Sequence, residues 1–187
     1  NHYIELLNRT CDQLIDLYGD MVAEKSTKII ISSTKADIEV IPNDSFESTR
    51  KIIKSKLNNH GDPLIISNAC ISGILAINTA ADYISHGLFD NVIVIGIDVL
   101  SDFVTFGFQS LYAISNEVTR PFDKSRKGIN LGEAAGAVLL SKNNLGKTFT
   151  AKYLGGSSSN DANHISGPSR TGEGLFRSIN KTLERSK

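Results

Sequence analysis

The stretch PLIISNACISGILAINTAADYISHGLFDNVIVIGID, residues 63–98, decides the fold. Its two ends, residues 63–67 and 91–98, are short apolar runs typical of buried strands. The middle predicts a helix that Gly87 ends, because its apolar side chains recur at helical spacing: Ile74, Ile77, Ala81 and Ile84. A strand, a tight turn, a helix and a second strand form a βαβ unit, so the sequence predicts a parallel pair of strands.

The flanking sequence continues this alternation. Residues 3–21 predict an amphipathic helix with one apolar stripe: Ile4, Leu7, Cys11, Leu14, Ile15 and Leu17. Residues 28–32 predict a buried strand. A second helix is expected to begin at Asp44 or Ser45 and to stop at Gly61. Residues 135–141 read as a further strand. The pattern indicates an α/β protein in which Cys11 packs in the core.

Composition narrows the function classes. The 187 residues are 40% hydrophobic, enough for one domain with a real core. Lys plus Arg and Asp plus Glu number 20 each, so bulk charge does not favour nucleic acid or an anionic membrane. Two cysteines cannot build a disulfide framework, no apolar stretch is long enough to span a membrane, and no signal peptide precedes the first helix. We expect a cytoplasmic chain, and a first residue of Asn1 suggests a trimmed product or an excised piece.

Cys70 is the candidate for chemistry. It lies in the turn before the central helix, where N–H groups and the helix dipole stabilise a thiolate and where its own amide can donate to an oxyanion. Its neighbours Ala69, Ser72 and Gly73 are small, which keeps the approach open and lets the helix pack closely on the sheet. Position alone leaves buried packing as the alternative, since no acid or histidine adjoins Cys70 in the sequence.

The motifs downstream of Cys70 favour a nucleophile over a buried packing residue. SNACISG around Cys70 is followed by FQSLYAIS at 108–115, RPFDKSRKGINLGEAAGAVLL at 120–140 and DANHISGPSRTGEG at 161–174. This ordered set resembles the β-ketoacyl-acyl carrier protein synthases, the elongating condensing enzymes of fatty-acid and polyketide synthesis. Thiolases share the CxSG turn, but the segment at 120–140 is specific to the synthases.

The resemblance implies a thiolase-like α/β fold, with a mixed, mostly parallel sheet and packed helices. It implies that residues 1–187 are the N-terminal half of a synthase, with the initial strand and the C-terminal half absent. In that family the nucleophile, here Cys70, takes an acyl group from a phosphopantetheine arm of acyl carrier protein, and a malonyl thioester then condenses with loss of carbon dioxide. The family's two histidines and lysine for decarboxylation belong to the C-terminal half, so we expect this piece alone to be inactive in condensation.

The resemblance also implies partners and further site residues. We expect acyl carrier protein as partner, a homodimer or heterodimer, no nucleic acid and no membrane span. We expect no cofactor beyond the substrates' phosphopantetheine, and no metal. The family places its pocket in the segment after Asp98, so Phe106, Phe108 and Tyr112 are candidates for the substrate channel or the interface.

Residues 120–136 have a structural interpretation. Arg120, Asp123 and Arg126 are expected to form a local ion-pair lattice, and Gly128, Gly132 and Gly136 to allow close backbone approach, with Glu133 serving architecture. His164 in the polar loop is expected to be a loop or interface residue rather than a catalyst.

Two other classes stay open. One is a noncatalytic partner like the chain-length factors, against which the presence of Cys70 argues because those partners lack the nucleophile. The other is a thiolase or another acyltransferase of the same superfold, which fits CISG but not the segment at 120–140. An interaction domain with a buried, unreactive Cys70 is the structural alternative.

Overall fold

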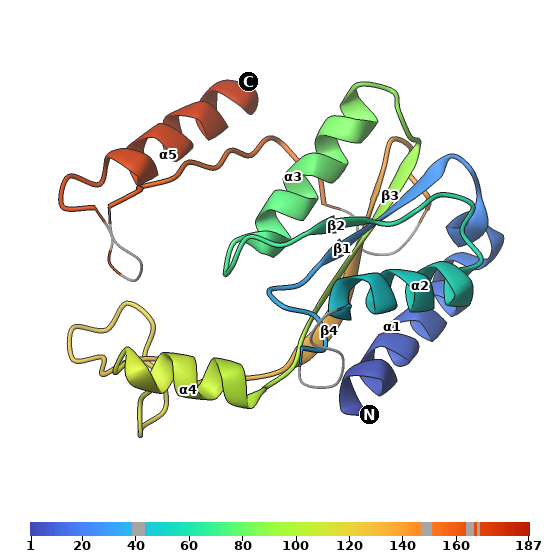
Figure 1. The fold of residues 1–187 in the computed structure, drawn as a ribbon. Coiled ribbons are helices and arrows are strands. Elements are labelled where there is room, and N and C mark those ends of the chain that lie inside the picture. Colours follow the sequence, from blue (N-terminus) through green and yellow to red (C-terminus); the bar gives the residue numbers. More distant parts are fainter. Residues whose placement is uncertain (39–43, 147–150, 164–166, 168) are drawn as a thin grey trace.

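The computed structural model describes residues 1–38, 44–146, 151–163, 167 and 169–187. Within these ranges one sheet is covered by helices on both faces (Figure 1). Its strands are β1 (Thr27–Ser32), β2 (Leu64–Ile66), β3 (Asn91–Asp98) and β4 (Ala134–Ser141). The order across the sheet is β2-β1-β3-β4, so β1 and β3 are central and β2 and β4 lie at the edges of the described sheet.

The sheet is mixed and mostly parallel, as predicted. β1 is parallel to both β2 and β3, with Ile30 opposite Leu64 and Val94. β4 is antiparallel to β3, and its register pairs Gly96 with Gly136. The predicted βαβ unit is therefore confirmed as β2, α3 (Ser72–Ser85) and β3, although β1 lies between the two strands of the unit. The carboxyl ends of the parallel strands β1, β2 and β3 lie at the same end of the sheet. The turn that follows β2 at this end contains Cys70.

Alternate residues of the central strands build two cores, because successive side chains point to opposite faces. One face packs against α1 (His2–Tyr18) and α2 (Ser45–Leu57), and its core includes Leu7, Cys11, Ile29 and Ile93. Cys11 is fully buried, as predicted. Burial raises the pKa of its thiol to about 11. Ile15 and Leu17 of the predicted stripe are instead exposed, because the apolar face of α1 is narrower than the sequence indicated.

The opposite face packs against α3, and here the predicted apolar stripe is correct in part: Ile77 and Ile84 are partly buried against this core, but Ile74 is not. Ser72, Ala76, Asn78 and Ala80 are the buried positions, whereas Ile74 is 60% exposed. The small side chains let the helix axis approach Ile30, Val92 and Val94, which complete this second core. Helical spacing could not choose the face because α3 carries apolar residues on more than one side.

The ends of α2 differ in part from the expectation. Asp44 occupies the N-cap position, as one of the two predicted candidates. The helix ends at Asn58, which takes the left-handed conformation at φ 48°, and not at Gly61. Asn tolerates this conformation better than most residues, so it replaces the glycine that a C-terminal cap commonly uses. His60, two residues after this cap, is exposed.

Two helices extend to one side of the sheet. The first is α4 (Asp102–Ser110), which follows β3 and starts at the N-cap Ser101. The second is α5 (Glu173–Arg185), which lies near the α3 side of the molecule (Figure 1). Short η1 (Gly19–Ala23) joins α1 to β1. Among the described residues no helix has both the length and the apolarity needed to cross a membrane.

Candidate active site

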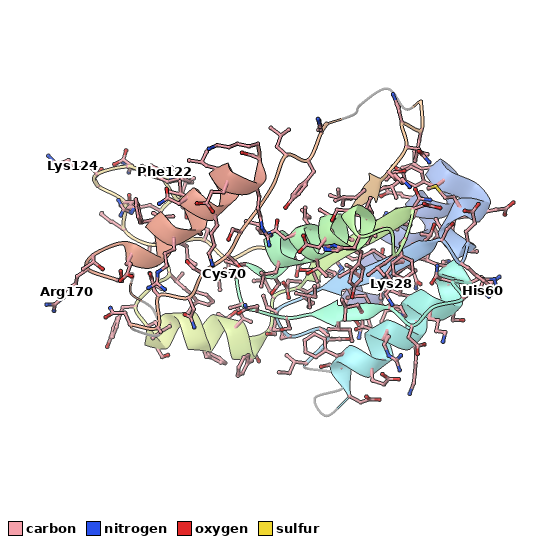
Figure 2. All side chains as sticks on the ribbon, turned by 90° about the horizontal axis from the view of Figure 1, so that it is seen from above. Lys28, His60, Cys70, Phe122, Lys124 and Arg170 are labelled. Atoms are coloured by element: carbon pink, nitrogen blue, oxygen red, sulfur yellow. The ribbon has the colours of Figure 1, made fainter. Side chains whose placement is uncertain are left out.

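Cys70 is exposed in a tight turn between β2 and α3. The turn is closed by two backbone hydrogen bonds, from the N–H of Ile71 to the carbonyl of Asn68 at 3.3 Å and from the N–H of Ser72 to the carbonyl of Ala69 at 3.2 Å. Both ribbon views show this turn projecting toward the side on which α4 and α5 lie (Figures 1 and 2). Among the described residues the thiol is open to solvent, which favours a reactive Cys70 over the alternative of a buried one.

Ser72 fixes the shape of the turn. Its hydroxyl accepts from the N–H of Asn68 at 2.7 Å and donates to the carbonyl of Ala69 at 2.6 Å, and its side chain is almost fully buried. Ala69 adopts the left-handed region at φ 46°, which is costly for a residue with a Cβ. The hydrogen bonds around Ser72 therefore hold a strained residue directly before Cys70.

The helix α3 begins two residues after Cys70, and no side chain caps it at its N-cap, Ile71. The N–H of Ser72 donates to the carbonyl of Ala69, and the next N–H groups of this first turn, those of Gly73 and Ile74, have no partner inside the helix. Gly73 lies over the end of β1, where an added Cβ would be 3.9 Å from Ser32 Oγ. The buried Ala76 and Ala80 confirm the expected close packing of the helix on the sheet. The arrangement provides N–H donors beside an exposed sulfur, as nucleophilic attack on a carbonyl requires.

The predicted channel residues lie on and after α4. Phe106 is 62% exposed, Phe108 is half-buried, and Tyr112 is 94% exposed with φ 53°. All three come from α4 and the connection after it, a segment that extends on the same side of the sheet as the turn between β2 and α3 (Figure 1). That they line a substrate channel or an interface stays a prediction.

The connection from α4 to β4 does not form the predicted lattice. Arg120 pairs with Glu117 at 3.0 Å, and Lys127 pairs with the same carboxylate at 2.8 Å. Asp123 instead accepts from the N–H and the hydroxyl of Ser125, which lower its pKa, while Arg126 donates to the backbone carbonyl of Asp123. The sequence analysis missed Glu117, because the acid that neutralises these bases lies upstream of the RPFD segment.

Two residues hold this connection in place. Asn130 accepts from the N–H and hydroxyl of Thr119 and donates to the carbonyls of Ser115 and Glu117. Glu133 accepts from the N–H of Leu100 at 3.1 Å, which agrees with its predicted architectural role. Its second oxygen lies 2.9 Å from Nε2 of His2. Neither Gly132 nor Gly136 lies where a Cβ would meet another atom within 4 Å, so the prediction of close approach is wrong at both.

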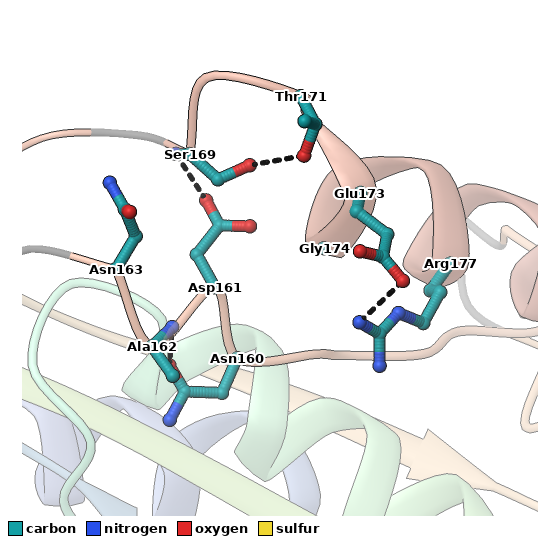
Figure 3. Close-up of a pocket in the computed structure, with 9 residues that line it drawn as sticks. All are labelled: Asn160, Asp161, Ala162, Asn163, Ser169, Thr171, Glu173, Gly174 and Arg177. Atoms are coloured by element: carbon teal, nitrogen blue, oxygen red, sulfur yellow. Dashed lines mark hydrogen bonds and ion pairs between the residues drawn. The ribbon is translucent and has the colours of Figure 1, made fainter.

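Two cavities lie away from Cys70. The first, of about 200 Å³, is at the start of α5 and is lined by polar residues that include Asp161, Ser169 and Arg177 (Figure 3). Asp161 accepts from the N–H of Ser169 at 3.1 Å. The interpretation of His164 as a loop or interface residue falls outside the described residues. The second cavity, of about 610 Å³, lies between the end of β1 and the start of α2 and includes Phe103, an aromatic residue that the sequence analysis did not select.

Comparison with known proteins identifies the class. The family described as "Beta-ketoacyl synthase, N-terminal domain" matches residues 23–145. Among curated relatives, 3-oxoacyl-[acyl-carrier-protein] synthase II, chloroplastic, of Arabidopsis thaliana is 33% identical over 63% of this chain and 24% of its own length. 3-Oxoacyl-[acyl-carrier-protein] synthase 2 of Coxiella burnetii is 28% identical over 86% of this chain and 42% of its own. The chain thus spans less than half the length of these relatives.

Solved structures agree on the fold. A β-ketoacyl synthase from Burkholderia phymatum matches all of this chain and 53% of its own with a TM-score of 0.85, at 21% identity. A ketosynthase in complex with its chain length factor from Xenorhabdus doucetiae matches 95% of this chain and 48% of its own with a TM-score of 0.73, at 26% identity. The fold is therefore the thiolase-like fold of ketosynthases. The chain belongs to the β-ketoacyl synthase family, and it matches the N-terminal domain.

Proposed function

We propose that this chain supplies the acyl-accepting half of a catalytic β-ketoacyl synthase, with Cys70 as the nucleophile. The observation that carries the proposal is the exposed Cys70 in a fixed turn at the start of α3, in a chain that matches the N-terminal domain of that family. A structural cysteine would be buried, as Cys11 is. A solvent-facing thiol beside helix N–H donors has the access and the environment that attack on a thioester needs.

The proposed first step is acyl transfer. The Cys70 thiolate attacks the carbonyl carbon of an acyl thioester on acyl carrier protein, and the new carbon–sulfur bond replaces the bond to the phosphopantetheine sulfur, which leaves and takes up a proton. In this proposal the N–H of Cys70 itself stabilises the negative oxygen of the tetrahedral intermediate, because the N–H groups of Ile71 and Ser72 are used in the hydrogen bonds that close the turn. The names of the curated relatives, which specify acyl carrier protein, support this partner.

The second step is decarboxylative condensation. A malonyl thioester loses carbon dioxide, its α-carbon attacks the Cys70 acyl group, and the Cys70 sulfur leaves as the new carbon–carbon bond forms. The resemblance assigns the groups that drive decarboxylation to the other half of the fold, so residues 1–187 alone are expected to stop at the acyl-enzyme. No cofactor or metal enters this scheme. The cytoplasmic location expected from the sequence stays a prediction, since two of the relatives carry chloroplastic names.

A second candidate is the noncatalytic partner of a synthase. The solved complexes of a ketosynthase with a chain length factor, from Xenorhabdus doucetiae and for ishigamide, show that proteins of this fold form such pairs. Cys70 favours the catalytic member of a pair, and leaves either a homodimer or a heterodimer as the assembly. Another thiolase-fold acyltransferase is the remaining alternative.

One experiment separates these functions. The full-length protein, with a candidate partner if it forms a heterodimer, is given an acyl carrier thioester and malonyl thioester labelled in its free carboxyl group. A synthase releases labelled carbon dioxide and forms a β-ketoacyl product two carbons longer than the acyl substrate, and Cys70→Ala abolishes this product. A chain-length-factor role predicts product formation that survives Cys70→Ala. A thiolase-type enzyme accepts acetyl thioester in place of malonyl and releases no carbon dioxide.

A further inference from the structure

Asp98, at the carboxyl end of β3, binds the segment that follows β1. Its Oδ1 accepts from the hydroxyl of Ser33 at 3.1 Å, and from the N–H and hydroxyl of Thr34 at 3.0 and 2.7 Å. Lys35 Nζ lies 3.4 Å from the same oxygen, and this side chain is only 8% exposed. Hydrogen bonds to a carboxylate are stronger than those between neutral groups, and a buried ammonium adds to them. The carboxylate therefore fixes the position of residues 33–35.

The same segment holds the end of β2, from which the Cys70 turn starts. Thr34, whose N–H and hydroxyl bind Asp98, accepts at its carbonyl from the hydroxyl of Ser67 at 3.1 Å. The N–H of Ser33 donates to the carbonyl of Ile66 at 3.4 Å. Ser67 precedes Cys70 by three residues, and the intervening Asn68 and Ala69 are fixed by Ser72. A continuous path of hydrogen bonds thus runs from Asp98 through Thr34 to the turn.

We infer that Asp98 is a positioning residue for Cys70, acting through Thr34 and Ser67. It anchors the start of the turn to the central strands, while Ser72 anchors the end of the turn to α3. This inference rests on the proposed function, because positioning matters to the extent that Cys70 is a nucleophile. The backbone strain at Ala69 explains why the turn needs an anchor at each end. A left-handed alanine is unfavourable, so its backbone relaxes to another conformation when one end of the turn is released.

The direction of the effect distinguishes positioning from charge. An effect of the Asp98 charge alone would have the opposite sign, because removing a carboxylate lowers the electrostatic repulsion on an attacking anion and speeds the reaction. Loss of the anchor moves the sulfur away from the N–H groups of α3 and slows them. A small displacement of a reacting group lowers the rate by one to two orders of magnitude, so we expect Asp98→Asn to slow acylation of Cys70 about tenfold.

The test measures two reactions of Cys70 in the full-length protein. One is acyl transfer from an acyl-phosphopantetheine thioester, and the other is alkylation by iodoacetamide, each followed on the peptide that contains Cys70. Cys11 is an internal control, because it is fully buried and is alkylated only when the fold opens. The variants are Asp98→Asn, Ser67→Ala and the double variant. Matched controls are Asp62→Asn, an exposed carboxylate that pairs with Lys54, and Ser85→Ala, whose hydroxyl donates to a carbonyl at the far end of α3.

Positioning predicts that Asp98→Asn and Ser67→Ala each lower the rate constant while the final extent of modification stays complete and Cys11 stays protected. Asp98→Asn weakens the path, because an amide oxygen accepts weaker hydrogen bonds than a carboxylate, and Ser67→Ala breaks it. The double variant is therefore no slower than the slower of the two single variants. A purely structural role predicts a reduced extent at an unchanged rate constant, with Cys11 alkylated. Three results would overturn the inference. The first is a reduced extent of modification with alkylated Cys11, the second is a double variant in which the two rate effects multiply, and the third is an Asp98→Asn variant that reacts faster than the unchanged protein. If the thioester does not react but alkylation follows the predicted pattern, the proposed function fails while the positioning role holds.

Discussion

Gly128 lies against the backbone of Ala113, and the two segments are joined by a hydrogen bond of 2.9 Å from the N–H of Ile129 to the carbonyl of Ala113. Gly128 has φ 132°, and a Cβ added there would lie 2.5 Å from the same carbonyl oxygen. The N–H of Ser115 returns a hydrogen bond to the carbonyl of Ile129 at 2.8 Å. This contact closes the connection between α4 and β4, which carries Tyr112, one of the predicted channel residues.

Gly128→Ala should destabilise the protein by about 1 to 3 kcal/mol, because it combines a strained backbone conformation with a contact on a carbonyl that cannot move freely. Equilibrium unfolding by denaturant measures the loss. Gly132→Ala is the matched control, since no atom lies within 4 Å of its added Cβ. Equal stability of the two variants would show that the close approach of Gly128 and Ala113 is not a constraint in solution.

Asn130→Ala should loosen residues 115–119 without unfolding the sheet. The change removes four hydrogen bonds that the Asn130 side chain makes with Ser115, Glu117 and Thr119. Hydrogen–deuterium exchange should show faster uptake over this loop and unchanged uptake in β1 and β3. Asn116→Ala, at an exposed neighbouring position, is the control. Uptake in the loop that equals the control's would contradict the assignment of Asn130 as the residue that holds it.

Tyr153→Phe should cost about 1 kcal/mol of stability, since it removes the hydrogen bond of 2.8 Å from the Tyr153 hydroxyl to Oδ1 of the buried Asn78 on α3. Thermal unfolding compares it with Tyr112→Phe, where the hydroxyl belongs to a side chain that is 94% exposed and no loss is expected. A neutral Tyr153→Phe would mean that residues 153–156 do not pack against α3.

Cys11 should make the protein sensitive to alkaline pH. Its pKa is raised by burial from 9.0 to about 11, so the unfolded chain loses this proton first and the free energy of unfolding falls as pH rises from about 9 to 11. The loss amounts to at most about 3 kcal/mol at 1.36 kcal/mol per unit of pKa. Below pH 9 this group contributes no pH dependence.

Denaturant unfolding at pH 8 and pH 10.5 measures this effect. Cys11→Ala lowers stability at both values because it leaves a cavity, but it should flatten the difference between them. Ser85→Ala, which removes an exposed hydroxyl that does not ionise between these pH values, is the control and should leave that difference unchanged. A Cys11→Ala variant that retains the full alkaline loss would assign the loss to another group, such as Tyr3, whose pKa is raised by burial to about 12.

The central strands and the position of Cys70 were predictable from the sequence because their signals are local. β1 and β3 are continuous β-branched runs, and a short stretch of small and polar residues between a strand and a helix leaves few shapes for the turn around Cys70. The partners of charged groups were not predictable, because Glu117 and Asp98 meet their partners only after the chain has folded. The sequence also did not indicate which face of α3 packs on the sheet. Ser72 and Ala76 are buried in place of Ile74, because close packing of a helix on a sheet favours small residues over large apolar ones.

The measurement that tests the central claim most directly is the mass of the Cys70 peptide after the full-length protein reacts with an acyl-phosphopantetheine thioester. The account predicts one acyl increment on that peptide, no increment on the peptide that contains the buried Cys11, and complete loss of acylation in Cys70→Ala. An unmodified Cys70 in protein shown to be folded, or acylation that persists in Cys70→Ala, would contradict the assignment of Cys70 as the nucleophile.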